Sequence, residues 1–270
     1  MKTENRVAWV TGGNSGIGLA TAKLFVENGM KVMITARNEE KGRIAEKELG
    51  ENAFFVKCDA ASSDDIDYAV KKIIDKWGRI DVVVNSAGVS IGDPIQMGGE
   101  VIEGNHPYIG NVLDNYKMNV AVNTIAPYEI TLKTAKYMAR NLPDEWQERG
   151  CYIYISSGAA TKLSTLSGFS IGYSASKASQ IGLMTSVAQN LAPLGIRAVT
   201  VLPGLIDTGM VPDFMKEKAP AIDQAFPKRV GEPSQIASMC LEIVKNSFIN
   251  QTTITVDAGW HITADVVPEQ

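Results

Sequence analysis

Residues 7–18 read VAWVTGGNSGIG, and this stretch decides the fold. Four apolar residues of the kind that favour strands lead directly into a glycine-rich turn, and an amphipathic helical pattern follows it. Glycine allows a tight turn and lets the backbone approach a phosphate, which the unpaired N–H groups at a helix N-terminus can bind. The stretch therefore predicts a nucleotide-binding turn between a strand and a helix. Its expected binding residues are Gly12, Asn14, Ser15, Gly16, Ile17 and Gly18.

The same order of apolar run and amphipathic stretch repeats along the whole chain. Strands are expected at residues 6–10, 31–35, 53–57, 80–84, 152–155, 197–202 and 252–256. Helices are expected at residues 16–28, 39–49, 64–77, 174–192 and 233–246. This alternation predicts the α/β class, as a doubly wound parallel sheet of the Rossmann type with about seven strands and helices on both faces. A ligand should then bind beyond the carboxyl ends of the strands.

The composition favours a single domain spanning residues 1–270. With 26 basic and 30 acidic residues the net charge is −4, which argues against a nucleic-acid partner. No apolar run reaches the roughly 18 residues of a membrane helix, and the first apolar run is too short for a signal peptide, so a cytoplasmic protein is expected. The dispersed Cys58, Cys151 and Cys240 are expected to be reduced thiols.

Two long segments interrupt the pattern, each directly after an expected strand. Residues 89–115 are rich in glycine, and residues 205–230 contain three prolines. Long loops in compact α/β domains tend to be functional. Both segments are therefore expected to be substrate loops, and residues 205–230 are expected to form a lid. The apolar residues that favour the lid are Met210, Phe214, Met215 and Phe226.

The end of the second expected strand bears on the choice of cofactor. It reads Thr35-Ala36-Arg37-Asn38, with no acid to accept hydrogen bonds from an adenosine ribose. The planar guanidinium of Arg37 suits a 2′-phosphate. We therefore expect NADP(H), with NAD(H) as the alternative.

Five motifs in a fixed order resemble those of the short-chain dehydrogenase/reductase family, in its shorter single-domain form. They are TGGNSGIG at 11–18, NSAG at 85–88, YSASK at 173–177, LPGLIDT at 202–208 and VDAG at 256–259. The resemblance covers nearly the whole chain. It implies a nicotinamide-dependent oxidoreductase, and a homo-oligomer, either a dimer or a tetramer.

A tyrosine four residues before a lysine occurs twice. Tyr68 and Lys72 lie in a charged helical stretch, whereas Tyr173 and Lys177 open a long helix that follows a serine-bearing strand. Residues i and i+4 share a helix face, so the Lys177 ammonium is expected to lower the pKa of Tyr173. We expect Tyr173 to exchange a proton with the substrate oxygen.

The resemblance also implies a serine and an asparagine in the catalytic group. Ser157, the second of a pair, is expected to hydrogen-bond the substrate oxygen, with Ser156 as the alternative. Asn123 is preferred over Asn119, and as a polar residue inside a helix it is expected to open the backbone ladder and hold a water near Lys177.

The remaining cofactor contacts come from the resemblance alone. Tyr173 and Lys177 are expected among them, in addition to their catalytic roles. The others are Asp59, Ala60, Asn85, Ala87, Gly88, Pro203, Gly204 and Thr208.

The expected reaction interconverts a secondary alcohol and a ketone. A hydrophobic substrate such as a steroid or bile acid is preferred, and a 3-ketoacyl thioester, a nucleotide-sugar epimerase or dehydratase activity and a non-catalytic NADP-binding sensor stay open. No metal is expected, because His106 and His261 have no partners at ligand spacing. The absence of a GxSxG elbow argues against a serine hydrolase.

Overall fold

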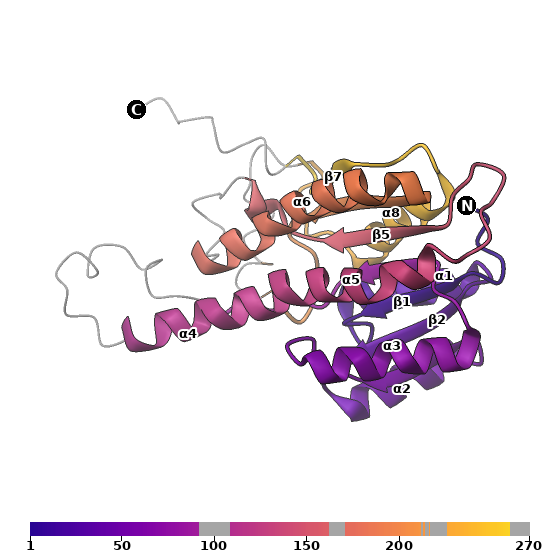
Figure 1. Cartoon of the computed structure of the whole chain (residues 1–270). Helices are drawn as coiled ribbons and strands as arrows, with labels where there is room; N and C mark the ends of the chain where they lie inside the picture. Colours follow the sequence, from indigo (N-terminus) through magenta and orange to yellow (C-terminus); the bar gives the residue numbers. More distant parts are fainter. Residues whose placement is uncertain (92–108, 162–170, 212, 214–215, 217–225, 260–270) are drawn as a thin grey trace.

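The computed structural model describes residues 1–91, 109–161, 171–211, 213, 216 and 226–259. Seven strands form one parallel sheet in the order β3-β2-β1-β4-β5-β6-β7 (Figure 1). The strands are β1 Val7–Thr11, β2 Lys31–Ala36, β3 Ala53–Lys57, β4 Val82–Asn85, β5 Gly150–Ile155, β6 Ile196–Pro203 and β7 Thr252–Val256. The predicted doubly wound parallel sheet is confirmed.

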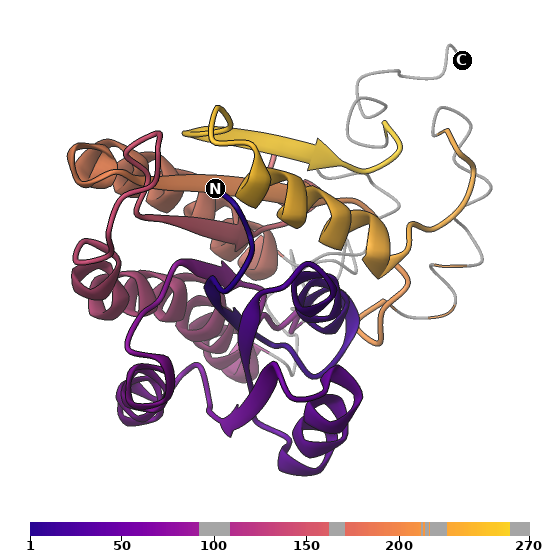
Figure 2. The ribbon, with the colours of Figure 1, turned by 90° about the vertical axis from the view of Figure 1, so that its right-hand side faces the viewer.

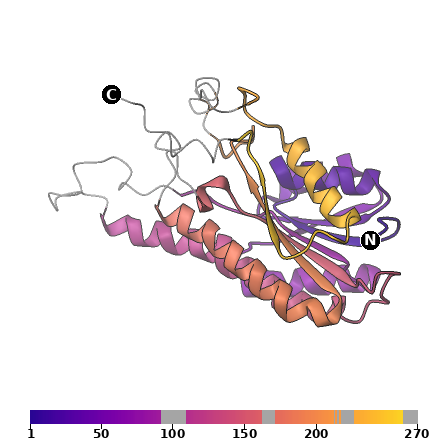
Figure 3. The same cartoon turned by 90° about the horizontal axis from the view of Figure 1, so that it is seen from above.

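Helices cover both faces of the sheet, as Figures 2 and 3 show. They are α1 Gly16–Glu27, α2 Glu39–Leu49, α3 Ser63–Trp77, α4 Ile109–Val120, α5 Ala126–Met138, α6 Ile171–Leu191 and α8 Pro233–Lys245. A π-helical turn, Ala121–Ile125, joins α4 to α5. The core has two halves because successive strand residues point to opposite faces. One half packs against α1, α2 and α8, and the other against α3, α5 and α6.

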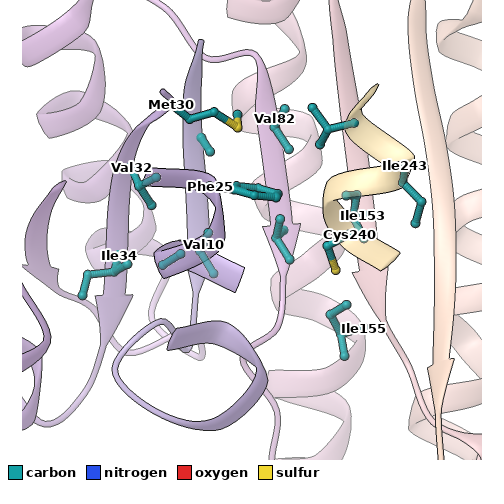
Figure 4. Close-up of a cluster of buried hydrophobic side chains, with 14 of the residues drawn as sticks. Val10, Phe25, Met30, Val32, Ile34, Val82, Ile153, Ile155, Cys240 and Ile243 are labelled. Atoms are coloured by element: carbon teal, nitrogen blue, oxygen red, sulfur yellow. The ribbon is translucent and has the colours of Figure 1, made fainter. Parts of the chain in front are cut away.

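The strand β1 illustrates this alternation. Ala8 and Val10 belong to the first half of the core, and Val7 and Trp9 to the second. Figure 4 shows the first half, where Phe25 of α1 lies among Val10, Val82 and other aliphatic side chains of the sheet. A strand that is buried on both faces appears in the sequence as a continuous apolar run, which is why this strand could be predicted.

The sheet has its topological switch point at β1. This strand pairs with β2 on one side and with β4 on the other, and all three run parallel. In open parallel sheets, ligands bind at the carboxyl ends of the strands beside such a point. The fold therefore places the glycine turn after β1 and the segment after β4 next to each other.

Two expected boundaries differ from the structure by more than two residues. The segment 89–115 was expected to be irregular throughout, but residues 109–115 are the first turns of α4. That helix packs on α6, where an added Cβ at Gly172 would come within 3.0 Å of the Tyr116 ring. The helix α6 begins at Ile171 rather than at residue 174. Packing between helices, which no local pattern reveals, sets both boundaries.

The cysteines behave as expected. Cys58, Cys151 and Cys240 are buried and free of disulfides. Burial raises the pKa of the Cys58 and Cys240 thiols to about 12, so both remain protonated and unreactive. None of the described helices combines the length and the apolar character that crossing a membrane requires.

Candidate active site

The turn between β1 and α1 has the backbone that its glycines predict. Gly12 and Gly16 have φ angles of +64° and +52°, a region that other residues rarely adopt. A Cβ at Gly18 would lie 2.3 Å from the Gly12 carbonyl oxygen, so only glycine fits there. Ser15 precedes α1 without capping it through its side chain. The turn therefore leaves the N–H groups at the start of α1 available to an anion.

Thr11, which the sequence analysis did not single out, ties this turn to the segment after β4. Its hydroxyl oxygen accepts hydrogen bonds from the N–H groups of Ser86 (3.0 Å) and Ala87 (2.9 Å). A Cβ at Gly12 would come within 3.0 Å of the Ala87 Cα. The only sequence signal for Thr11 was its place at the head of the glycine motif.

Asn85, at the end of β4 beside the glycine turn, points to a polar ligand at this edge of the sheet. Its side chain is 1 % exposed, and neither its Oδ1 nor its Nδ2 has a hydrogen-bond partner among the described residues. Buried polar groups are rarely left unpaired, because each costs the free energy of its lost hydration. Together with the glycine turn at the switch point, this unpaired amide fits a nicotinamide dinucleotide.

The other expected cofactor residues follow the same edge of the sheet. Arg37 is exposed directly after β2, and no acid among the described residues pairs with it. Asp59 and Ala60 follow β3, and the Asp59 carboxylate accepts a hydrogen bond from the Ala61 N–H. Pro203 ends β6, Gly204 follows it, and the Thr208 methyl group would lie 3.1 Å from a Cβ at Gly16.

The structure brings Ser157 and Tyr173 together. Ser157 follows β5, Tyr173 lies in the first turn of α6, and their hydroxyl groups lie close enough to interact. The Ser156 hydroxyl instead donates to the Lys177 carbonyl oxygen at 2.8 Å. The second serine of the pair therefore faces the tyrosine, and the first anchors α6.

Burial dominates the ionisation of Tyr173 and Lys177, each only 4 % exposed. It lowers the pKa of Lys177 to about 8, and the ammonium donates to the Ile155 carbonyl oxygen at 2.9 Å. Burial also raises the pKa of Tyr173, and the bond to Ser157 offsets this only in part. The expected lowering of the Tyr173 pKa was therefore wrong for this structure, because desolvation of the buried hydroxyl outweighs the interaction with Ser157.

Asn123 lies in the π-helical turn and is fully buried. Its Oδ1 accepts from the Val89 N–H at 3.0 Å, and its Nδ2 donates to the Val89 carbonyl at 2.8 Å and to the Ser176 hydroxyl at 3.0 Å. Ser176 in turn donates to the Tyr173 carbonyl at 2.7 Å. A Cβ at Gly88 would lie 3.1 Å from the Lys177 Nζ, so all of these groups meet at one point.

Asn119, the alternative to Asn123, makes a similar bond pattern one turn earlier. Its amide accepts from the Ile91 N–H at 3.2 Å and donates to the Ile91 carbonyl at 2.9 Å. The two asparagines thus hold alternate residues of the segment after β4. Asn123 alone of the two is bonded to Ser176, which links it to Tyr173.

The second tyrosine–lysine pair lies elsewhere. Tyr68 is 51 % exposed on α3, and the Lys72 Nζ lies 5.0 Å from the centre of its ring. A tyrosine four residues before a lysine can therefore also be a surface contact. What distinguishes the Tyr173–Lys177 pair is the neighbouring strand with its serine.

Several expectations lie outside the described residues. These are His106, His261, Phe214, Met215 and most of residues 89–115. The described residues contain no cluster of His, Cys, Asp and Glu that could hold a metal ion. Met210 and Phe226 are 48 % and 84 % exposed, and the lid remains a prediction.

Comparisons with known proteins agree with this geometry. Residues 6–219 match the family model described as short chain dehydrogenase, so the chain belongs to the short-chain dehydrogenase/reductase family and is an oxidoreductase of that kind. It is 32 % identical over 260 residues to the 3-hydroxyacyl-CoA dehydrogenase type-2 of Bos taurus, covering 94 % of each chain. It is 31 % identical over 264 residues to the ipsdienol dehydrogenase of Ips pini, covering 96 % of this chain and 98 % of the relative.

A solved structure is similar over nearly its whole length. It is the 3-ketoacyl-(acyl-carrier-protein) reductase from Brucella melitensis complexed with NADH, with a TM-score of 0.80 and 25 % identity over 96 % of this chain and 99 % of that one. This likeness and the family membership support a nicotinamide cofactor for the present chain.

Proposed function

We propose that this protein interconverts a secondary alcohol and a ketone with NADP(H), using Tyr173 as the proton-transfer group. The observation that carries the proposal is the meeting of Ser157, Tyr173, Lys177 and Asn123 beside the glycine turn and the unpaired Asn85. A bound nicotinamide would supply or accept the hydride. The chain's own residues hold the proton and orient the substrate.

Each residue has a role that its environment supports. Tyr173, whose raised pKa keeps it protonated near neutral pH, donates its proton to the carbonyl oxygen in the direction of reduction. Ser157 interacts with the Tyr173 hydroxyl and is therefore placed to bind the same oxygen. Lys177, whose pKa burial lowers to about 8, provides a positive charge beside these groups near neutral pH. Asn123 fixes the segment after β4 through Val89.

The substrate class is expected to be hydrophobic, as the apolar residues of the segment 205–230 indicate. Relatives that carry the names 3-hydroxyacyl-CoA dehydrogenase and 3-ketoacyl-(acyl-carrier-protein) reductase favour an acyl thioester as the first class to test. Steroids and bile acids form the second class.

The direct test is a panel of ketones and alcohols of these classes, followed by the change in absorbance of the reduced nicotinamide. Turnover of one class with NADP(H) supports the proposal, whereas turnover with NAD(H) alone supports the alcohol–ketone chemistry and contradicts the cofactor. Cofactor binding without turnover of any class would contradict it and would favour a sensor.

Arg37 is expected to set the cofactor preference. Changing Arg37→Asp should weaken NADPH binding by about 10- to 100-fold, the worth of one or two charge-assisted hydrogen bonds, with little effect on NADH. The measurement is the dissociation constant of both cofactors by fluorescence titration. Lys47→Asp, the same change of charge at the exposed far end of α2, is the matched control. If the ratio of the dissociation constants for NADPH and NADH is unchanged in Arg37→Asp, Arg37 does not set the cofactor preference.

The outer face of α4, α5 and α6 is proposed as the contact between copies of the chain. Ile125, Tyr128 and Leu132 share one helix face and are more than half exposed. A Cβ at Gly182 of the neighbouring α6 would meet nothing within 4 Å. Figures 1 and 3 show α4 and α6 running side by side. An exposed apolar stripe of this kind is typical of an interface.

Leu132→Glu tests this contact. A buried, unpaired carboxylate at an interface should shift the protein toward the monomer at micromolar concentration, as measured by light scattering after size exclusion. Leu142→Glu, at a residue that is 84 % exposed beyond the end of α5, serves as the control. A wild-type protein that is already monomeric would rule the contact out.

A further inference from the structure

The π-helical turn leaves a carbonyl without its usual donor. In an α-helix the Asn123 carbonyl would accept from the residue four positions later, which is Pro127 and has no N–H. The ladder widens here instead, and the Ala126 N–H bonds to the Ala121 carbonyl. The Asn123 carbonyl therefore lacks its α-helical donor, and it can accept a hydrogen bond from another element.

Gln180 supplies that donor. This residue of α6 is fully buried, and its Nε2 donates to the Asn123 carbonyl oxygen at 2.7 Å. It lies three residues after Lys177, on the same side of the helix. Its Oε1 has no partner among the described residues, so the bond to Asn123 is the hydrogen bond that this side chain makes with them.

The bond from Gln180 lies at the site where a water was expected, next to Asn123. Asn123 was expected to open the backbone ladder and hold a water near Lys177. The ladder does open, but one acceptor position of the carbonyl is taken by a neutral amide. The Gln180 amide is neutral and does not transfer protons. A water bound to the same carbonyl could transfer protons to or from Lys177.

We propose that Gln180 is a positioning residue, which locks the turn carrying Asn123 to the helix carrying Tyr173 and Lys177. Through this bond it keeps the Asn123 side chain paired with Val89, in the segment that follows β4 and Asn85. The catalytic part of the proposal rests on the proposed oxidoreductase function. The coupling between Gln180 and Val89 does not, so it can be measured on the protein without ligands.

The variant Gln180→Met removes the donor and keeps an unbranched side chain of similar length. Hydrogen–deuterium exchange of the ligand-free protein should show the Val89 amide exchanging about 10-fold faster, because its acceptor on Asn123 is no longer fixed. The kcat should fall by about 10- to 100-fold with little change in the affinity for cofactor. Met184→Ala, which creates a cavity one turn further along α6, is the matched control. It should lower stability without moving either readout.

The variant Gln180→Glu covers the case in which Gln180→Met does not fold. A protonated carboxyl can donate to the Asn123 carbonyl and an ionised one cannot, so protection of Val89 should be kept at low pH and lost as pH rises. Wild-type protection of Val89 in both variants at every pH overturns the proposal. A wild-type enzyme that turns over no alcohol or ketone would refute the proposed function instead, and the exchange data would still decide the role of Gln180.

Discussion

Replacing Tyr173 by phenylalanine is expected to lower kcat by about 10³-fold, the usual worth of a positioned acid–base group. The change removes one hydroxyl from a side chain that is 4 % exposed, and the ring keeps its place in α6. The Ser157 hydroxyl loses one partner but still accepts from the Ala159 N–H at 3.2 Å. Binding of the cofactor, measured by fluorescence titration, should change by less than about 10-fold.

Tyr68→Phe is the matched control within the same chain. Tyr68 also lies four residues before a lysine, but it is exposed on α3, so its kcat should equal that of the wild type. Retained turnover in Tyr173→Phe would remove this residue from the proton path. A loss of turnover in both variants would point to a general effect on folding, which circular dichroism would detect.

The sheet could be predicted because its strands are buried on both faces. Such strands appear as short runs of apolar residues, as in β1 and β4. The edge strands β3 and β7 are only partly buried, but their residues favour strands, and both were placed with the bounds that the structure has. The glycine turn was predictable for a similar reason, because Gly12 and Gly18 meet steric limits that only glycine satisfies. Strong local constraints of this kind can be predicted from a sequence.

The contacts across helices could not be predicted in the same way. Nothing in the sequence shows that Gln180 reaches Asn123, since 57 residues separate them and both positions read as ordinary helix. The same holds for Thr11 and Ala87, which are 76 residues apart. The sign of the Tyr173 pKa shift also needed the structure, because it depends on how deeply the hydroxyl is buried.

Lys177→Met is expected to abolish turnover and yet stabilise the fold near neutral pH. Burial lowers the pKa of Lys177 from 10.5 to about 8, and a shift of that size corresponds to about 3 kcal/mol. The folded state carries this cost at pH 7, where the lysine is protonated in both states. Methionine carries no charge, and the lost bond to the Ile155 carbonyl offsets about 1 kcal/mol of the gain. The free energy of unfolding should therefore rise by about 2 kcal/mol.

The pH dependence identifies the cause of this gain. Between about pH 8 and 10.5 the unfolded chain binds more protons at this lysine than the folded chain, so wild-type stability rises with pH as the cost is relieved. The difference between the variant and the wild type should consequently shrink from pH 7 to pH 9.5, as measured by urea unfolding. Lys72→Met, at an exposed lysine of α3, should show no such trend. The Lys177→Met protein could instead be less stable than the wild type by the same amount at every pH. In that case burial of the ammonium would not destabilise the folded state, and the lowered pKa would not describe this site.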